Sequence, residues 1–399
     1  MERTSAQLNE LEITYQYGVS LDSLGLDNSE LVRSDFIFVF TFILKISRQT
    51  NSNPIFEYLI FYRYQKSQFI RPHLCSRYKY LTLSHLFRVK IQTLITSALI
   101  VSSLYLIWLN CARNLERRYA SKYAVVTGAT GGVGQEIVAE MLKTMHVIAV
   151  DRDEQLLTDL VLKHKSSKNL VLPFVFDFTN KLSTFGPKFD SFLRQYNVDK
   201  LDVGMCFSNA GIGEFKQFEA SSFEAKARFM QVNFSSHLAI SDYFCKLFLT
   251  RTHAKSALIV TSSLITGTCG RFFALYHTSK TMLSALAASL YSEYASKGID
   301  VLAVHPSSIA NTKFMKGEGM KTLDSFASKY ISHIGNLWIS VTPKQIVAQM
   351  LSRVGKLNQT FVGFATVLNA IQGALLGRNL NAFLWSKCTF LDKLFTKNQ

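Results

Sequence analysis

The feature that most constrains this chain is an alternation of short apolar runs with amphipathic stretches, which begins at Lys122. Six short apolar runs have the pattern of buried strands, at 123–128, 146–151, 170–177, 201–211, 256–263 and 298–308. Segments with helical spacing separate them, such as 133–142 and 279–294. Strands that alternate with helices form a parallel sheet, so the sequence predicts an α/β fold with a doubly wound sheet and helices on both faces.

A glycine-rich turn follows the first predicted strand and opens the first predicted helix. It reads TGATGGVG from Thr127 onward. Glycine permits tight backbone angles and lets a pyrophosphate approach the main chain at the positive N-terminus of a helix. A glycine-rich turn without a ligand is the alternative. The residues predicted to bind a dinucleotide are Gly128, Thr130, Gly132, Val133 and Gly134.

Residues suited to proton transfer follow the fifth predicted strand. Ser263 ends the run SALIVTSS, and Tyr276 and Lys280 lie within YHTSK. Tyrosine has a free pKa of about 10 and needs a nearby cation to act near neutral pH. Lys280 lies one helical turn beyond Tyr276 and is predicted to supply that charge; the alternative is an exposed helical pair. Ser263 is predicted to donate a hydrogen bond to a substrate carbonyl or developing alkoxide.

Together these segments resemble the short-chain dehydrogenase/reductase superfamily. The glycine turn matches its TGxxxGxG pattern, Ser208 to Gly211 (SNAG) resembles its NNAG, and YxxxK follows the serine by thirteen residues. The resemblance covers about Lys122 to Lys356. It implies a Rossmann-like fold and hydride transfer with a nicotinamide cofactor, which Lys280 also helps to bind. It further implies a catalytic role for Asn233 in FMQVNF, which would hold a water in a proton path, and cofactor contacts from Asn209, Ala210 and Gly211.

Two acidic residues and an arginine bear on the choice of cofactor. Asp151 ends the second predicted strand, where a carboxylate accepts bonds from the adenine ribose and repels a 2′-phosphate. Arg152 follows it and is suited to binding that phosphate. The sequence therefore favours NAD and leaves NADP open. Asp177 ends the third predicted strand and matches the family's adenine-binding Asp, with a turn or helix N-cap residue as the alternative.

The segment after the sixth predicted strand departs from the family pattern. Residues 305–313 read HPSSIANTK and resemble the family's PGxVxT loop, but Ser307 replaces the glycine and Thr312 comes one residue late. The resemblance implies that Pro306 and Thr312 lie at the nicotinamide carboxamide. The altered loop supports an alternative function, a catalytically inactive cofactor-binding scaffold at a membrane. The intact tyrosine and lysine argue against that alternative.

Within the superfamily, four segments resemble the membrane-bound 3-ketoacyl-CoA reductase and 17β-hydroxysteroid dehydrogenase group: FDFTN, LDVGMCFSNAG, LYSEYASKGIDV and ANTK. Members of that group act on long acyl chains or sterols and usually prefer NADP. The resemblance implies that the chain interconverts a hydroxyl and a carbonyl on a lipophilic substrate. It leaves a homodimer open.

An uncharged run of 19 residues, Ile91 to Leu109, precedes the first predicted strand. Basic residues flank it on both sides, and Tyr105 and Trp108 lie near its end, as in helices that cross a bilayer. An unusually apolar core helix is the alternative. We expect 91–110 to be a membrane anchor. The basic residues on both sides leave its orientation open; the hypothesis is an anchor in the endoplasmic reticulum with the catalytic domain facing the cytosol.

Basic and aromatic residues are interleaved before this run. Residues 45–90 contain nine Lys and Arg and one Glu, which gives this segment a net charge of nine minus one, or +8. This is half of the chain's formal net charge of +16. This composition suits a membrane interface and also single-stranded nucleic acid. No nucleic-acid motif accompanies it, so the sequence favours the membrane and predicts no nucleic-acid partner. The apolar stretch 36–46 is too short to cross a bilayer.

The remaining predictions concern metals and boundaries. The six cysteines are scattered without a CxxC pair, so no metal site is predicted. We expect four regions: 1–90 of unassigned role, the anchor 91–110, a catalytic domain 120–356 and an extension 357–399. The apolar stretch 361–377 in that extension fits a core helix, a lid or a second membrane contact.

Overall fold

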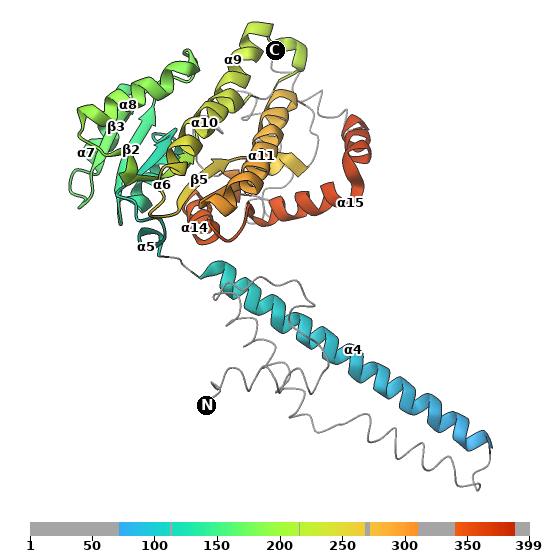
Figure 1. Cartoon of the computed structure of the whole chain (residues 1–399). Helices are drawn as coiled ribbons and strands as arrows, with labels where there is room; N and C mark the ends of the chain where they lie inside the picture. The colour runs from blue at the N-terminus through green and yellow to red at the C-terminus, as the bar shows by residue number, and fades with distance from the viewer. Residues whose placement is uncertain (1–71, 112–113, 215, 268–271, 310–339, 388–399) are drawn as a thin grey trace, which may run out of the picture. The chain divides into compact units, whose positions relative to one another are not determined.

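The computed structural model describes residues 72–111, 114–214, 216–267, 272–309 and 340–387. The chain divides into two units, residues 1–105 and 106–399. The second unit contains a parallel sheet with helices on both faces (Figure 1). Residues 1–71, with their apolar stretch 36–46, and Thr312 lie outside the described residues.

Seven parallel strands form the main sheet in the order β3-β2-β1-β4-β5-β6-β9. The prediction of a doubly wound sheet of the α/β class is confirmed. The sequence predicted six of these strands but missed β9, which pairs with the end of β6. β9 is only four residues long and half polar (QTFV), so it lacks the apolar run that marks the other strands. The strand bounds are β1 Tyr123–Thr127, β2 His146–Asp151, β3 Val171–Val175, β4 Val203–Ser208, β5 Ser256–Thr261, β6 Ile299–Pro306 and β9 Gln359–Val362.

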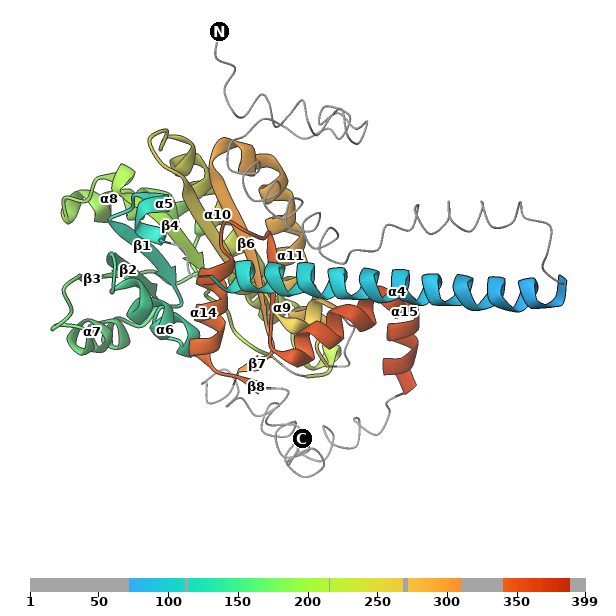
Figure 2. The same ribbon diagram turned by 90° about the horizontal axis from the view of Figure 1, so that it is seen from below.

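Helices connect the strands, and a separate pair, β7 (Ser308–Ile309) and β8 (Ser340–Val341), lies beside the main sheet (Figure 2). The α-helices are α4 Pro72–Asn110, α5 Leu115–Tyr119, α6 Gly132–Met141, α7 Glu154–Lys163, α8 Phe185–Gln195, α9 Phe223–Met230, α10 Ser236–Leu249, α11 Ala274–Tyr294, α14 Pro343–Arg353 and α15 Phe364–Lys387. A π-helical turn, η5 (Gln231–Ser235), joins α9 to α10. Single 3₁₀ turns are η2 Leu182–Thr184, η3 Lys200–Asp202, η4 Phe218–Ala220, η6 Leu264–Gly267 and η7 Ala295–Lys297.

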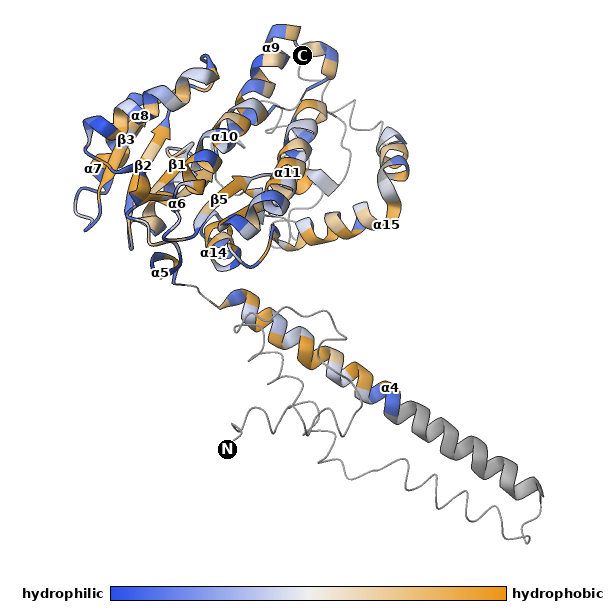
Figure 3. Cartoon of the chain, viewed as in Figure 1, coloured by the Kyte–Doolittle hydropathy of each residue, from blue (hydrophilic) through white to orange (hydrophobic). Residues whose placement is uncertain are grey.

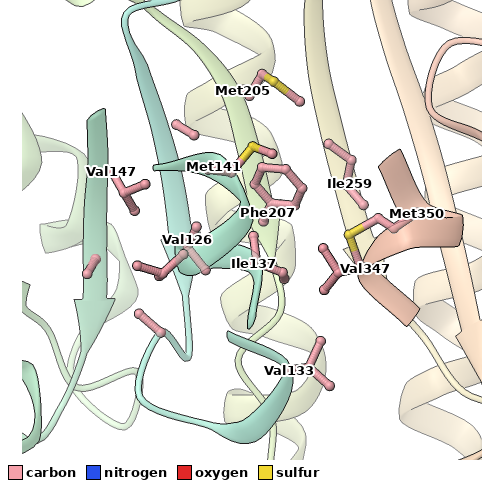
Figure 4. Close-up of a cluster of buried hydrophobic side chains, with 14 of the residues drawn as sticks. Val126, Val133, Ile137, Met141, Val147, Met205, Phe207, Ile259, Val347 and Met350 are labelled. Carbon is pink, nitrogen blue, oxygen red and sulfur yellow. The ribbon is translucent and has the colours of Figure 1, made fainter. Parts of the chain in front are cut away.

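Two apolar cores hold the helices against the two faces of the sheet. On one face α6, α7 and α14 pack through residues such as Ile137, Leu157 and Met350. Figure 4 shows Phe207 and Ile259 of the sheet among the side chains of α6 and α14. On the other face α8, α10 and α11 pack around a phenylalanine-rich cluster that includes Phe174, Phe176, Phe185, Phe189 and Phe244. Burial on both faces explains why the strands read as continuous apolar runs.

The predicted anchor lies within α4. Its stretch Lys90–Asn110 is 21 residues long with a mean hydropathy of 1.6, and no residue of its 18-residue apolar window is buried. At 1.5 Å per residue this stretch is about 31 Å long, close to the ~30 Å hydrocarbon core of a bilayer. A core helix would be mostly buried, so the exposure of these residues disagrees with that alternative.

An ion pair on a buried carboxylate fixes the start of the catalytic unit to the sheet. Asp300, at the beginning of β6, accepts hydrogen bonds from Arg118 Nε at 2.7 Å, Arg118 Nη2 at 3.0 Å and Tyr119 Oη at 2.9 Å. Tyr119 is fully buried, and burial is the main cause that raises its pKa far above the usual value. Arg251 donates to the main-chain oxygens of Tyr119 and Ala120. These bonds hold α5 at the edge of the core.

Asp300→Ala should therefore destabilise the protein strongly, because two donors on α5 lose their acceptor in a place that water reaches poorly. We expect a loss of about 3 kcal/mol in the free energy of unfolding, measured by urea denaturation. Asp242→Ala is the matched control, since Asp242 pairs with Lys246 on the exposed surface of α10 and should cost under ~0.5 kcal/mol. Equal losses in the two variants would refute a structural role for the Asp300 pair.

Candidate active site

The glycine turn brings the backbone of β1 against that of β4. Gly128 has φ of 64°, the left-handed region that favours glycine, and a Cβ there would lie 2.9 Å from Ala210 Cα. A Cβ at Gly134 would overlap the carbonyl oxygen of Gly128. Gly131 is the N-cap of α6, and no side chain caps that helix in the described structure. The N–H groups at the helix N-terminus thus face a tight, glycine-rich turn, which fits the pyrophosphate of a dinucleotide.

One hydroxyl joins the ends of the two central strands. Thr127 Oγ1 accepts hydrogen bonds from the backbone N–H of Asn209 at 2.9 Å and of Ala210 at 3.1 Å. The side chain of Asn209 extends the link: its amide donates to Thr127 O, and its oxygen accepts from Thr261 at 3.1 Å. The predicted SNAG segment therefore lies directly beside the glycine turn, where the strand order reverses and α/β proteins bind their ligands.

Asp151 lies at the end of β2 and holds the glycine turn from the other side. Its Oδ2 accepts from Thr130 N at 3.0 Å and Thr130 Oγ1 at 2.8 Å, and its Oδ1 accepts from Arg152 N at 2.8 Å. A carboxylate has about four acceptor positions, so one remains for a ribose hydroxyl. Asp177 Oδ1 accepts a hydrogen bond from the backbone N–H of Thr179 at 2.8 Å. This is the bond expected of a turn residue, the alternative interpretation of Asp177.

Ser263, Tyr276 and Lys280 meet at the carboxyl end of β5. All three are buried, with exposed fractions of 8%, 8% and 4%. Tyr276 shares a hydrogen bond with Ser263. Tyr276 and Lys280 lie one turn apart on α11, and Lys280 Nζ is 5.8 Å from the tyrosine ring centroid. Lys280 Nζ donates to Thr261 O at 2.9 Å, so its charge has one main-chain partner on the strand.

Burial dominates the protonation of this group. It raises the pKa of Tyr276 to about 12, against the lowering effect of the hydrogen bond with Ser263. It lowers the pKa of Lys280 to about 8. The sequence analysis assigned the lowering of the tyrosine pKa to Lys280, whereas here the lowering influence on Tyr276 is Ser263. At neutral pH the tyrosine therefore holds its proton and the lysine is mostly charged.

Asn233 occupies the π-helical turn between α9 and α10 and is fully buried. Its Oδ1 accepts from Ile212 N and its Nδ2 donates to Ile212 O, both at 2.9 Å. Such turns widen a helix by one residue and often occur at functional sites. A Cβ at Gly211 would lie 3.0 Å from Asn233 Oδ1 and 3.6 Å from Lys280 Nζ. Both groups therefore border the space in front of Gly211.

His237 was not among the predicted site residues, and it supports the SNAG segment from behind. Its Nε2 lies 2.8 Å from the carbonyl oxygen of Ala210, and its Nδ1 lies 2.7 Å from Ser208 Oγ. A carbonyl only accepts, so Nε2 carries the proton and Nδ1 accepts from the serine. Burial, followed by the charge of Lys280, lowers the pKa of His237 to about 3 and keeps it neutral. Ser208 was the one sign in the sequence of such a residue, because it stands where the family has Asn and its buried hydroxyl needs a hydrogen-bond acceptor.

His305 is a second buried histidine outside the predicted set. Its Nδ1 lies 3.2 Å from both Ser263 O and Thr266 Oγ1, and its ring stacks on Phe361 of β9. Burial lowers the pKa of His305 to about 4. The next residue, Pro306, ends β6 at the same edge of the sheet as Ser263, whereas the position of its predicted partner Thr312 lies outside the described residues.

Fold and site together define a class: a doubly wound α/β protein with a dinucleotide turn beside a buried serine, tyrosine and lysine. The family model for short chain dehydrogenases matches residues 122–322. The chain belongs to this family, and the predicted enzyme class, an NAD(P)-dependent dehydrogenase/reductase, is confirmed.

Curated relatives agree with the predicted resemblance within the family. The chain is 25% identical over 264 residues to a very-long-chain 3-oxoacyl-CoA reductase of Caenorhabditis elegans, covering 62% of this chain and 79% of the relative. It is 24% identical over 246 residues to the 17β-hydroxysteroid dehydrogenase type 3 of Mus musculus, covering 59% and 77%. A solved 7β-hydroxysteroid dehydrogenase has a similar fold, with a TM-score of 0.55 at 19% identity, over 65% of this chain and 94% of that one.

Tyr276→Phe should lower kcat by about a hundredfold or more, because only the ionisable hydroxyl is lost. The dissociation constant for the cofactor should change little, since the ring remains. Tyr291→Phe, also on α11 and outside the site, is the matched control and should keep kcat within about twofold. A Tyr276→Phe rate within tenfold of the wild type, ~1.4 kcal/mol, would show that Tyr276 is not the acid/base.

The pH dependence of carbonyl reduction should follow Lys280. Its pKa of about 8 is lowered, so the ammonium charge is present below that value and is lost as the pH rises through it. We expect kcat/KM to fall above about pH 8, while the proton of Tyr276 stays in place up to about 12. Lys280→Arg should move this decline to higher pH, because guanidinium stays charged. A profile that stays flat to pH 10 would contradict this assignment.

Proposed function

We propose that this protein transfers a hydride between a nicotinamide cofactor and a carbonyl or hydroxyl group on a lipophilic substrate, either a long-chain 3-oxoacyl thioester or a steroid. The observation that supports it most is the buried group of Ser263, Tyr276 and Lys280 next to the glycine turn. Burying the lysine ammonium group and the tyrosine hydroxyl costs free energy. A catalytically inactive scaffold would gain nothing in return, so the buried pair argues against that alternative.

In the reducing direction, the substrate oxygen lies between Ser263 and Tyr276. Ser263 donates a hydrogen bond that orients the carbonyl, and the Tyr276 O–H bond breaks as its proton passes to the substrate oxygen. Lys280 stabilises the phenolate that remains. Asn233 Oδ1 and Lys280 Nζ border the space where a water returns the proton. The bound cofactor supplies the hydride.

The cofactor is held by residues on both sides of the strand-order reversal. We propose that the α6 N-terminus with Gly128, Gly132, Val133 and Gly134 binds the pyrophosphate, and Asp151 and Asp177 the adenosine. Asn209, Ala210 and Gly211 line its path to the nicotinamide, and Lys280 bonds the nicotinamide ribose. Pro306 lies at the carboxamide, where Thr312 is the expected side-chain donor.

Two curated relatives support the proposed substrate class, because their names are those of a 3-oxoacyl-CoA reductase and a 17β-hydroxysteroid dehydrogenase. Purified full-length protein should oxidise NADH or NADPH when supplied with long-chain 3-oxoacyl-CoA or with ketosteroids, followed by absorbance. Tyr276→Phe on the same panel controls for background reduction. No turnover on any member, with the cofactor bound normally, would favour the scaffold.

The membrane part of the proposal rests on the apolar 21-residue stretch of α4. We propose that it anchors the protein in the endoplasmic reticulum with the catalytic domain in the cytosol. Carbonate extraction should leave the full-length protein in the membrane pellet. Removal of residues 1–111, which retains Arg118 and Tyr119, should move the protein into the carbonate supernatant, because Lys90–Asn110 is the one helix of the described residues that is long and apolar enough to cross a bilayer. Full-length protein in the supernatant would refute the anchor.

The cofactor preference depends on Asp151 and Arg152. We propose that the wild type prefers NAD, because Asp151 repels a 2′-phosphate. Asp151→Asn should move the ratio of kcat/KM towards NADP by about tenfold, ~1.4 kcal/mol, since it removes charge and keeps an oxygen for Thr130. Arg152→Ala is the paired variant and should lower kcat/KM with NADP only. A wild-type preference for NADP above tenfold would overturn the assignment.

A further inference from the structure

Helix α15 is rich in hydrophobic residues, as the colouring of Figure 3 shows. Its large apolar side chains are exposed. Leu375 is 78% exposed, and the others are between 36% and 55% exposed. Globular proteins rarely expose contiguous apolar surface unless it contacts a partner or a membrane. The face consists of Phe364, Val367, Leu368, Ile371 and Leu375. α15 is kinked at Gly377, whose φ of 66° and ψ of 170° are not helical; the exposed Leu376 directly precedes this kink, and the exposed Leu380, Phe383 and Leu384 follow it.

The opposite face of α15 is made of small residues and packs closely on the catalytic unit. Thr366 is buried, and a Cβ at Gly373 would overlap the carbonyl oxygen of Gly267 in η6. The same face borders a cavity of about 370 Å³ against α11. The helix is therefore seated through its small residues, and its large apolar residues are not needed to fill the core.

The chain ties α15 to the point where α4 ends. Lys356 Nζ donates to the main-chain oxygens of Trp108 and Cys111, both at 2.7 Å, and Arg353 donates to Asn110 Oδ1 at 3.0 Å. A cation on the last carbonyls of a helix also interacts favourably with its dipole. α15 begins eight residues after Lys356, so at most about 28 Å of extended chain separates them.

We propose that α15 lies in the surface of the same membrane that α4 crosses, with its large apolar face among the acyl chains. The proposal rests on the membrane anchor proposed above. Asn110 is the last residue of α4, and the bonds of Arg353 to Asn110 and of Lys356 to Trp108 and Cys111 hold the chain before α15 near that surface. The charge agrees, because the 24 residues of α15 contain Arg378 and Lys387 and no acidic residue. A bilayer with anionic lipids attracts such a helix.

This arrangement makes a membrane-embedded helix the support of the active site. α15 packs on η6, which begins at the residue after Ser263. The proposal therefore includes the bilayer as the source of a lipophilic substrate, since the helix placed at the membrane also packs beside Ser263.

Lipid labelling tests the contact. Full-length protein is placed in vesicles of phosphatidylcholine and phosphatidylserine that include a phosphatidylcholine with a photoactivatable diazirine on its acyl chain, and labelled peptides are mapped by mass spectrometry. Label on both 91–110 and 364–387 is expected. Label on 91–110 alone overturns the inference and leaves the anchor intact. Label on neither overturns both. A crosslinked dimer through an unlabelled 364–387 shows that a second copy covers α15 and also overturns the inference.

A pair of matched variants tests the consequence for turnover. The test variant, Ile371→Asp with Leu375→Asp, places two charges on the outward face of α15. The control variant, Leu162→Asp with Leu170→Asp, places two charges at exposed leucines on α7 and directly before β3. The two control leucines match in character, since they are 61% and 59% exposed. The α15 variant should lose lipid label and about tenfold or more in kcat/KM for a long-chain substrate in vesicles. It should keep its rate with a short, water-soluble substrate, and the control should keep both. Equal long-chain rates in the two variants overturn the inference.

Discussion

The buried ammonium group of Lys280 constrains everything around it. A buried charge is costly unless it is paired or hydrogen-bonded, and here Thr261 O at the end of β5 accepts its bond. Ser262 Oγ donates in return to the main-chain oxygen of Lys280 at 2.9 Å, so helix α11 is bound to β5 at two points. Burial is the main cause that lowers the pKa of His237 and of His305, and the charge of Lys280 lowers both further. Both histidines therefore remain neutral. The site therefore holds one cation among neutral hydrogen-bonding groups.

The neutral histidines give the neighbouring loops their positions. His237 holds the SNAG segment through Ser208 and Ala210, and His305 holds the main chain of Ser263. Neither side chain is placed to touch the reacting atoms in this arrangement, because both have their ring nitrogens directed at the protein's own groups. They stabilise the surfaces against which cofactor and substrate bind. Removing a partner from such a network leaves a buried polar group unsatisfied, which costs more than the bond itself.

The strand that the sequence analysis missed connects the site to the proposed membrane surface. β9 pairs with β6 from Ala303 to Pro306, stacks Phe361 on His305, and leads through Gly363 into α15. Before β9, Lys356 bonds to the end of α4. One short segment of chain thus joins the end of α4, the last strand of the sheet and the helix that packs on η6. The boundary expected at residue 356 falls within this connected segment.

The sequence by itself determined the class of fold and the proposed catalytic residues. Both are local properties: a strand buried on two faces reads as an apolar run, a dinucleotide turn needs glycines at fixed spacing, and Tyr276 and Lys280 share a helical face because they are four residues apart. What the tertiary structure decided depends on residues far apart in the chain. β9 is too short and polar to recognise alone, and His237 matters only because folding brings it to Ser208 and Ala210. The role of α15 also stayed open, because its apolar residues fit a core helix, a lid or a membrane contact equally well. Only packing shows which face is covered, and here the small residues are covered and the large apolar ones are not.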